Sequence, residues 1–236
     1  MTRNVHTYDH FCLVARALEQ VGDRWSLLVI RDLLTGTKRF TDLMARLAGI
    51  TPKTLSQRLR ELEAAGLLLA DREPGRREVW YRLTPAGTDL GPVIDALRIW
   101  GLSHAWRRPQ SGEPVHAEHL LRNATQAIDI AADDHRPARW HFRLDGEDYL
   151  VESDGHHWSL TTGTPTNPAD VTITATTPSL ARFIFGDPGH DLPIAGDTEH
   201  VQRFRRLITT MATLVEPPDQ PQHDTSRLFD TAPQGK

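Results

Sequence analysis

Residues 41–83 carry the pattern that most restricts the fold of this chain: two short amphipathic helices followed by a hairpin. Apolar residues recur at helical spacing after Thr41, a candidate N-cap. Ala48-Gly49-Ile50 then predicts a tight turn. Thr51-Pro52 begins a second helix, because proline suits the first helical turn, where its missing N–H costs nothing. That helix is predicted to reach Ala65, with three leucines on one face, and the pair matches a helix-turn-helix.

A basic hairpin follows this pair of helices. Two strand-like runs, residues 67–73 and 78–83, flank a Pro74-Gly75 turn. Arg76 and Arg77 come directly after the turn, and two cations at a hairpin tip can lie on a phosphate backbone or enter a minor groove. With helices predicted at 11–21, 25–34 and 84–106, the first half of the chain is predicted to be a winged helix-turn-helix domain.

The polar side of the second helix is the candidate DNA-reading surface. Its side chains are of the types that hydrogen-bond base edges and phosphates. Plain solvent exposure is the alternative for any such helix face, and the basic hairpin favours DNA. The candidate DNA-binding residues are Thr51, Lys53, Thr54, Ser56, Gln57, Arg58 and Arg60 on the helix, Arg39 before it, and Arg76 and Arg77 in the hairpin.

Charge divides the chain into two halves. Residues 1–110 hold 17 lysines and arginines against 12 aspartates and glutamates, whereas residues 111–236 hold 10 against 19. A polyanion would therefore meet the first half. The predicted divisions are a DNA-binding and dimerisation domain over 1–107, a linker over 108–114, a second domain over 115–215 and a disordered tail over 216–236.

The second half is predicted to be a helix-covered antiparallel sheet, so the whole chain falls in the α+β class. Alternating apolar and polar residues predict strands at 139–144, 148–153, 156–162 and 170–176. Helices are predicted at 115–132, after Pro178, and at 197–213.

Several runs of the first half resemble the HxlR-type winged-helix regulators. They are Gly22-Asp-Arg-Trp25, Arg39-Phe-Thr-Asp-Leu43, Gly49-Ile-Thr-Pro-Lys-Thr-Leu-Ser-Gln-Arg-Leu-Arg-Glu-Leu-Glu63 and Tyr81-Arg-Leu-Thr84. This resemblance implies a homodimer formed through the first and last helices of the domain. It also implies a transcriptional regulator that binds a roughly palindromic operator, with half-sites about 34 Å apart.

The runs Ala169-Asp-Val-Thr-Ile173 and Ile194-Ala-Gly-Asp197 resemble sterol carrier protein-like domains. That resemblance implies a ligand-binding unit over 115–215 and an apolar small-molecule effector. The candidate cavity residues are Trp140, Phe142, Trp158, Ile173, Phe183 and Phe185. The alternative is that these side chains are simply the core of the domain. A lipid or small-molecule carrier whose DNA-binding part is not regulatory is the other function left open.

Cys12, the single cysteine, excludes an internal disulfide. It stands where HxlR-type proteins commonly have a cysteine, so it is a candidate redox sensor, or else a small buried hydrophobic residue of the dimer interface. No nucleophile motif, cofactor fingerprint or metal-ligand spacing is present, so we expect no enzyme, no cofactor and no metal. No run is long enough to span a membrane and the first residues do not predict a signal peptide, so we expect a cytoplasmic location.

Overall fold

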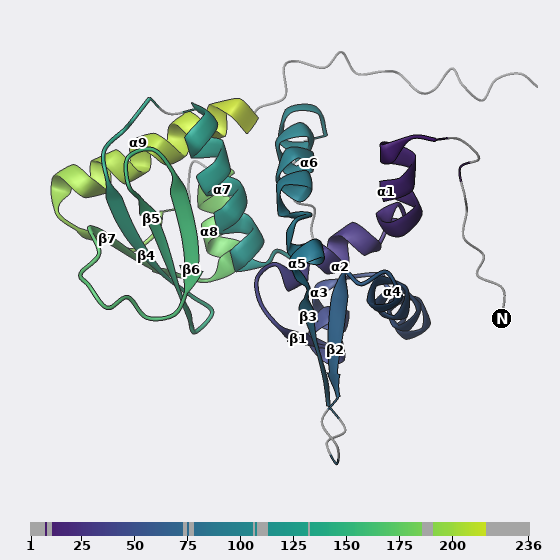
Figure 1. Ribbon diagram of the computed structural model, residues 1–236. Coiled ribbons are helices and arrows are strands. Elements are labelled where there is room, and N and C mark those ends of the chain that lie inside the picture. Colours follow the sequence, from purple (N-terminus) through teal and green to yellow (C-terminus); the bar gives the residue numbers. More distant parts are fainter. Residues whose placement is uncertain are drawn as a thin grey trace, which may run out of the picture.

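The structure is a computed structural model that describes residues 8, 11–72, 75, 78–105, 107, 113–131, 133–185 and 191–215, with 211–215 described by their backbone alone. Figure 1 shows two units side by side, a group of helices with a long hairpin and a sheet covered by helices. Within these residues, no helix is long and apolar enough to cross a membrane.

The first unit is a winged helix-turn-helix, as the sequence predicts. Its three-stranded sheet has the order β1-β3-β2 and is antiparallel throughout. Fully buried apolar side chains such as Ile30, Leu43, Leu55 and Leu62 form its core. The elements are α1 (Leu13–Val21), α2 (Ser26–Leu33), β1 (Lys38–Arg39), α3 (Phe40–Arg46), α4 (Pro52–Ala64), β2 (Leu68–Arg72), β3 (Val79–Leu83), α5 (Pro85–Thr88) and α6 (Gly91–His104).

Helix α4 begins where its sequence predicts. The Thr51 hydroxyl accepts a hydrogen bond from the backbone N–H of Thr54 at 3.1 Å, which caps the helix. Pro52 occupies the first turn. The turn from α3 requires Gly49, whose φ of +83° is a conformation that side chains with a Cβ rarely adopt.

Two local predictions were wrong. Helix α3 is capped by Arg39 rather than Thr41, because the Asp42 carboxylate accepts the backbone N–H of Arg39 at 2.8 Å. The helix predicted over 84–106 is two helices, α5 and α6. Pro92 accounts for the break, because its ring would clash with a carbonyl of a continuous helix and it has no N–H to donate.

The second unit contains a five-stranded mixed sheet. Its order is β6-β5-β4-β7-β8, and β4 and β7 are parallel where the sequence predicted an all-antiparallel arrangement. Residues 163–170 carry the chain from β6 at the sheet edge to the far side of β4, which makes this pair a crossover connection. The elements are α7 (Ala117–Ala131), β4 (Ala138–Leu144), β5 (Glu147–Ser153), β6 (Trp158–Thr162), β7 (Val171–Ala175), α8 (Thr177–Ile184), β8 (Ile194–Gly196) and α9 (Thr198–Val215).

Helices cover one face of this sheet (Figure 1). Side chains alternate along the strands, so that Trp140 and Phe142 of β4 face the helices and are nearly fully buried. Phe204 of α9 is fully buried between them, with ring centroids 4.9 Å from Trp140 and 6.1 Å from Phe142. The opposite face carries ion pairs such as Arg139 with Glu152 at 2.6 Å.

Candidate nucleic-acid interface

The outward side of α4 is polar, and the opposite, apolar side of the same helix packs against the core. Leu55, Leu59 and Leu62 are buried against the first unit's core. The intervening positions therefore point away from the core, and Lys53, Gln57 and Arg60 are exposed. Seven of the sequence-predicted DNA-binding residues lie on this helix or its cap: Thr51, Lys53, Thr54, Ser56, Gln57, Arg58 and Arg60.

Hydrogen bonds order part of this polar surface. The Gln57 amide oxygen accepts from the Arg60 guanidinium at 2.8 Å, and the Gln57 amide nitrogen donates to Glu61. Lys53, near the positive end of the helix, has no ion pair within the described residues. The surface thus combines a cation available for a phosphate with an amide held in a defined orientation.

Arg58 and Arg39 differ from these residues because each is already paired. The Arg58 guanidinium lies 3.4 Å from Asp23 and 2.6 Å from Glu61, and its Nε is buried without a partner. Arg39 pairs with Asp42 at 3.1 Å and stacks on Trp80 at 5.4 Å. Arg58 thereby links α4 to Asp23, and Arg39 links β1 to α3 and β3. A DNA phosphate that bound either arginine would have to compete with the carboxylates that already pair with it.

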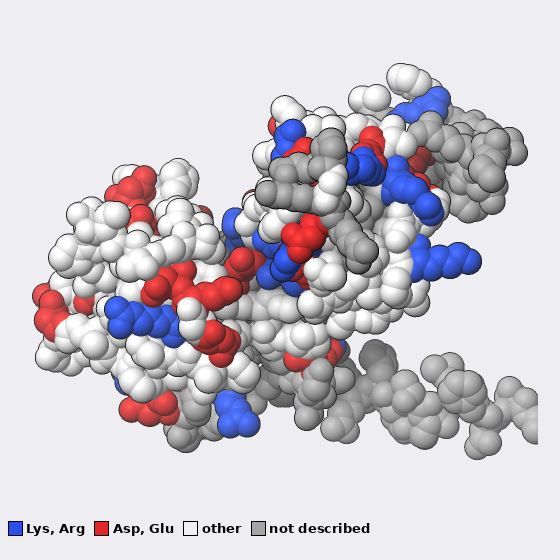
Figure 2. All heavy atoms as spheres, turned by 90° about the horizontal axis from the view of Figure 1, so that it is seen from below, with Lys and Arg blue, Asp and Glu red and all other residues white. Residues whose placement is uncertain are grey.

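The β2–β3 hairpin extends beside α4 (Figure 1). Arg72 of β2 forms a bidentate ion pair with Glu63 of α4, at 2.7 and 2.9 Å, which fixes the hairpin relative to the helix. Arg76 and Arg77 lie outside the described residues. In the view of Figure 2, blue side chains predominate over the winged-helix unit and red ones over the sheet unit.

Exposed apolar side chains gather on α1 and α6. Leu13 of α1 is 76% exposed, and Leu97 and Trp100 of α6 are 50% and 59% exposed. Both helices rise from the side of the unit opposite the hairpin (Figure 1). Cys12 lies half-buried at the start of α1, between Phe11 and Leu13, so it borders this apolar surface.

The structure places the six predicted cavity residues in or against the hydrophobic core of the second unit, and a ligand-binding role for them stays a prediction. Trp140, Phe142 and Ile173 are buried core side chains, and Trp158 and Phe183 pack against the same core. The Phe204 ring packs against Trp140, Phe142 and Phe183, and a void of about 10 Å³ lies beside Trp140 and Phe142, toward Leu121 of α7 and Leu180 of α8. A void of that size is at the lower limit for a single water molecule.

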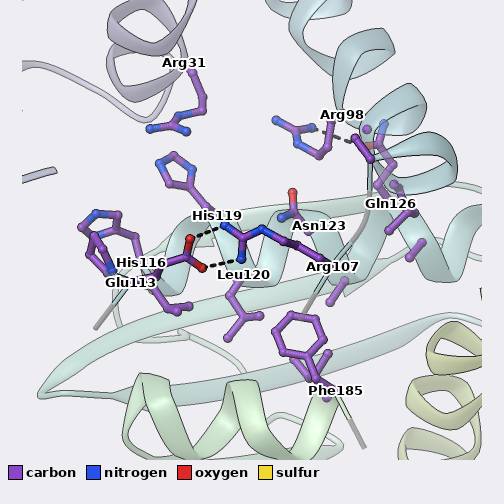
Figure 3. Close-up of a pocket in the computed structure, with 18 of the residues that line it drawn as sticks. Arg31, Arg98, Arg107, Glu113, His116, His119, Leu120, Asn123, Gln126 and Phe185 are labelled. Atoms are coloured by element: carbon purple, nitrogen blue, oxygen red, sulfur yellow. Dashed lines mark hydrogen bonds and ion pairs between the residues drawn. The ribbon is translucent and has the colours of Figure 1, made fainter. Parts of the chain in front are cut away.

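A larger pocket of about 570 Å³ lies instead where the two units meet. Of the six predicted cavity residues, Phe185 lines it. Figure 3 shows Arg31 and Arg98 projecting from the winged-helix side, with Asn123 of α7 between them and Phe185 on the opposite wall. The pair formed by Arg107 and Glu113 crosses the same space.

A cluster of buried polar residues that was not predicted from the sequence joins the two units. Asp32 of α2 is fully buried and accepts hydrogen bonds from His119 of α7 at 2.7 Å and Arg46 of α3 at 3.2 Å. Arg46 also pairs with Glu118, and His116 donates to the Arg46 carbonyl at 3.1 Å. A signal for this cluster existed, because a charged Asp32 inside an apolar helical run needs a buried partner.

The pKa values of the cluster follow from this packing. Burial acts to raise the pKa of Asp32, but the hydrogen bond from His119 and the charge of Arg31 outweigh it and hold that pKa well below its ordinary range. Burial lowers the pKa of His119 below the ordinary 6.5. The hydrogen bond to Asp32 acts to raise this pKa, and the positive charge of Arg31 lowers it further. His119 is therefore held neutral, with the Nε2 proton directed at Asp32. Among the described residues, no group of acids, histidines and cysteines could hold a metal ion.

A helix-turn-helix with an adjacent β-hairpin, and an exposed polar surface on its second helix, defines the class of winged-helix DNA-binding proteins. Comparison with known families agrees: residues 20–109 match the model described as HxlR-like helix-turn-helix. An HTH-type transcriptional regulator of Methanothermobacter thermautotrophicus is 35% identical over 106 residues, covering 44% of this chain and 81% of that protein. The chain belongs to the HxlR-like helix-turn-helix family of transcriptional regulators.

Other relatives cover similar shares of the chain. An HTH-type transcriptional regulator of Mycobacterium bovis is 46% identical over 111 residues, which are 45% of this chain and 66% of that protein, so the chain spans just under two thirds of that relative's length. Among solved structures, a regulator of the MarR family from Porphyromonas gingivalis has a TM-score of 0.39 and 28% identity, covering 41% of this chain and 96% of that one. Each of these matches covers less than half of this chain.

Proposed function

We propose that this chain regulates transcription as a homodimer on a two-fold symmetric operator. The observation that carries the proposal is the outward polar surface of α4, with Lys53, Gln57 and Arg60 exposed above a leucine face that is fully packed. In each protomer this helix would enter a major groove, and the hairpin holding Arg76 and Arg77 would contact the flanking backbone. The proposed function involves no catalysis. We infer a cytoplasmic location for the protein from its proposed DNA target.

The exposed apolar side chains of α1 and α6 support the dimer. Single exposed apolar residues are ordinary, but several of them on two helices that rise from the same side of the unit indicate a contact surface (Figure 1). A second copy of the same chain would cover Leu13, Leu97 and Trp100 by a two-fold axis, in the manner that the family resemblance implies. The axis would set the two α4 helices about one DNA turn, roughly 34 Å, apart.

Regulation by a small molecule is the second part of the proposal. A sterol carrier protein-like unit over 115–215 is supported by the helix-covered sheet, although its core is filled. The pocket of about 570 Å³ is within the size range of small-molecule sites and is bordered by both units. A ligand there would act on DNA binding through the relative placement of the units, provided that it prefers one placement.

Two single variants test the docking of α4. Duplexes selected by the wild-type chain from random sequences would be titrated by fluorescence anisotropy at several salt concentrations. Lys53→Ala should weaken binding to all sequences and reduce the log–log salt slope by about 1, because it removes one phosphate contact. Gln57→Ala should change which sequence is preferred, because it removes a group that contacts base edges.

Gln202→Ala is the matched control, since Gln202 is exposed on α9 in the other unit. It should leave both affinity and preference unchanged. An unchanged sequence preference in Gln57→Ala would refute the placement of this helix in the major groove.

A further inference from the structure

The pocket between the two units is lined by cationic side chains from the first unit and apolar ones from both. Arg31 of α2 and Arg98 of α6 project into it from the winged helix (Figure 3). Leu102 of α6, Leu120 of α7 and Phe185 after α8 form its apolar wall. Four arginines line the pocket, and Glu113 is the one acid among the described residues that do so.

Arg31 and Arg98 do not use all their N–H groups in hydrogen bonds within the described residues. The Nε of Arg31 is buried without a hydrogen-bond partner, and its acid, Asp32, is shared with Arg46 and His119. Arg98 is 16% exposed and pairs with Asp95, which itself is half exposed, and with the amide oxygen of Gln126 at 3.3 Å. A guanidinium has five N–H donors, so both residues retain donors for a further acceptor.

The electrostatic environment of Arg98 favours an added anion. Burial lowers the pKa of Arg98, and the nearby charges of Arg122 and Arg31 lower it further, against the opposing effect of Asp95. Like charges crowded into a partly buried site are relieved by a bound anion.

We propose that this pocket binds a small amphipathic carboxylate, with its head group on Arg31 and Arg98 and its apolar part against Leu102, Leu120 and Phe185. This deepens the effector site of the proposed function, on which its regulatory role rests. The head group contacts the winged helix and the apolar part reaches Leu120 and Phe185 of the sheet unit, so the ligand bridges the two units. Arg98 also lies on α6, the helix whose exposed side carries Leu97 and Trp100. Ligand binding is thereby linked to the surface that is proposed to form the dimer.

The test is a calorimetric titration of the full chain, without DNA, with three probes. Decanoate has both parts of the ligand, 1-decanol lacks the charge and acetate lacks the apolar part. Decanoate should bind at least about tenfold more tightly than either, which corresponds to about 1.4 kcal/mol. Equal binding of decanol would overturn the role of the arginines, and equal binding of acetate would overturn the role of the apolar wall.

Variants locate the site. The double variant Arg31→Gln with Arg98→Gln should lose the preference for decanoate over decanol, whereas Arg143→Gln, an exposed arginine on β4 outside the pocket, should keep it. Gly101→Leu is a second variant that does not depend on removing a charge. Gly101 lines the pocket, and a Cβ there meets no other atom within 4 Å, so the added side chain can occupy the pocket without a clash at its base.

Gly101→Leu should weaken decanoate binding at least about tenfold with no loss of thermal stability, because leucine is a better helix former than glycine. Decanoate binding that is unchanged in both the double variant and Gly101→Leu would refute the site. Because no DNA is present, this result is independent of whether α4 binds a duplex.

Discussion

At the scale of single residues, Asp32 is the position on which the contact between the two units depends. One buried carboxylate accepts from side chains of α2, α3 and α7 at once, through Arg31, Arg46 and His119. A buried charge of this kind costs free energy unless it is paired, so each partner is needed to offset the loss of hydration. The two units are therefore joined by this polar contact together with an apolar one, in which Leu102 of α6 packs against the core of the second unit.

This contact predicts an acid-sensitive stability. The folded-state pKa of His119 lies below its ordinary 6.5, so as the pH falls below 6.5 the unfolded chain binds more protons than the folded one. The stabilisation that comes from a neutral, buried His119 is therefore present above pH 6.5 and is lost as the pH falls below it. Protonation of Asp32 causes a second loss of stability only below pH 3.8, the ordinary pKa of an aspartate. Arg31 and Arg46 oppose a charge on His119, and the His116 ring lies 5.8 Å from it.

Thermal melts at pH 7.5 and 5.5 would measure this effect. Wild-type protein should lose more stability on acidification than His119→Gln, whose amide can still donate to Asp32 but does not titrate. His200→Gln, at a half-buried position on α9 outside this contact, is the matched control and should retain the wild-type pH dependence. The same pH dependence in His119→Gln and wild type would contradict the assignment.

At the scale of elements, the sequence predicted α4 and its orientation because all its determinants are local. The Thr51 cap, Pro52 in the first turn, leucines at helical spacing and the terminal glycine all act within the helix itself. The parallel pairing of β4 with β7 could not be predicted in this way, because partner choice between distant strands leaves no local pattern. The positions of four of this sheet's five strands were nevertheless predicted from their alternation, and the short β8 was not.

The exposed side of α6 gives an element-scale prediction. Leu97→Asp should turn the dimer into a monomer in sedimentation equilibrium, because it places a charge in an apolar contact. Its thermal unfolding as a monomer should remain cooperative, since Leu97 is half exposed in the single chain. Leu69→Asp is the control, because Leu69 is exposed to a similar degree on β2, in the hairpin and away from α1 and α6. A Leu97→Asp variant that sediments like wild type would refute this interface.

At the scale of the whole molecule, the two halves of the chain carry opposite net charges, and the basic half holds the winged helix-turn-helix. The polar surface of α4 was predicted from the sequence residue by residue, whereas the pocket between the two units was not predicted. Aromatic side chains predicted to line a cavity fill a core instead, because Phe204 from the last helix occupies the space between them. Whether side chains from distant parts of the chain fill a space completely depends on tertiary packing. That packing cannot be predicted from the pattern of a single sequence.

The central claim is that the outer side of α4 enters duplex DNA twice in each assembled regulator, and tethered cleavage tests it most directly. The chain has one cysteine, so a Cys12→Ser background allows an iron chelate to be attached at Gln57→Cys alone, or at Gln202→Cys as a control. On the duplex that each labelled protein itself selects, the chelate at position 57 should cut in two clusters about ten base pairs apart, and the chelate at position 202 should cut in neither. A single cluster, or no cutting from position 57 on a duplex that the labelled protein demonstrably binds, would contradict the account.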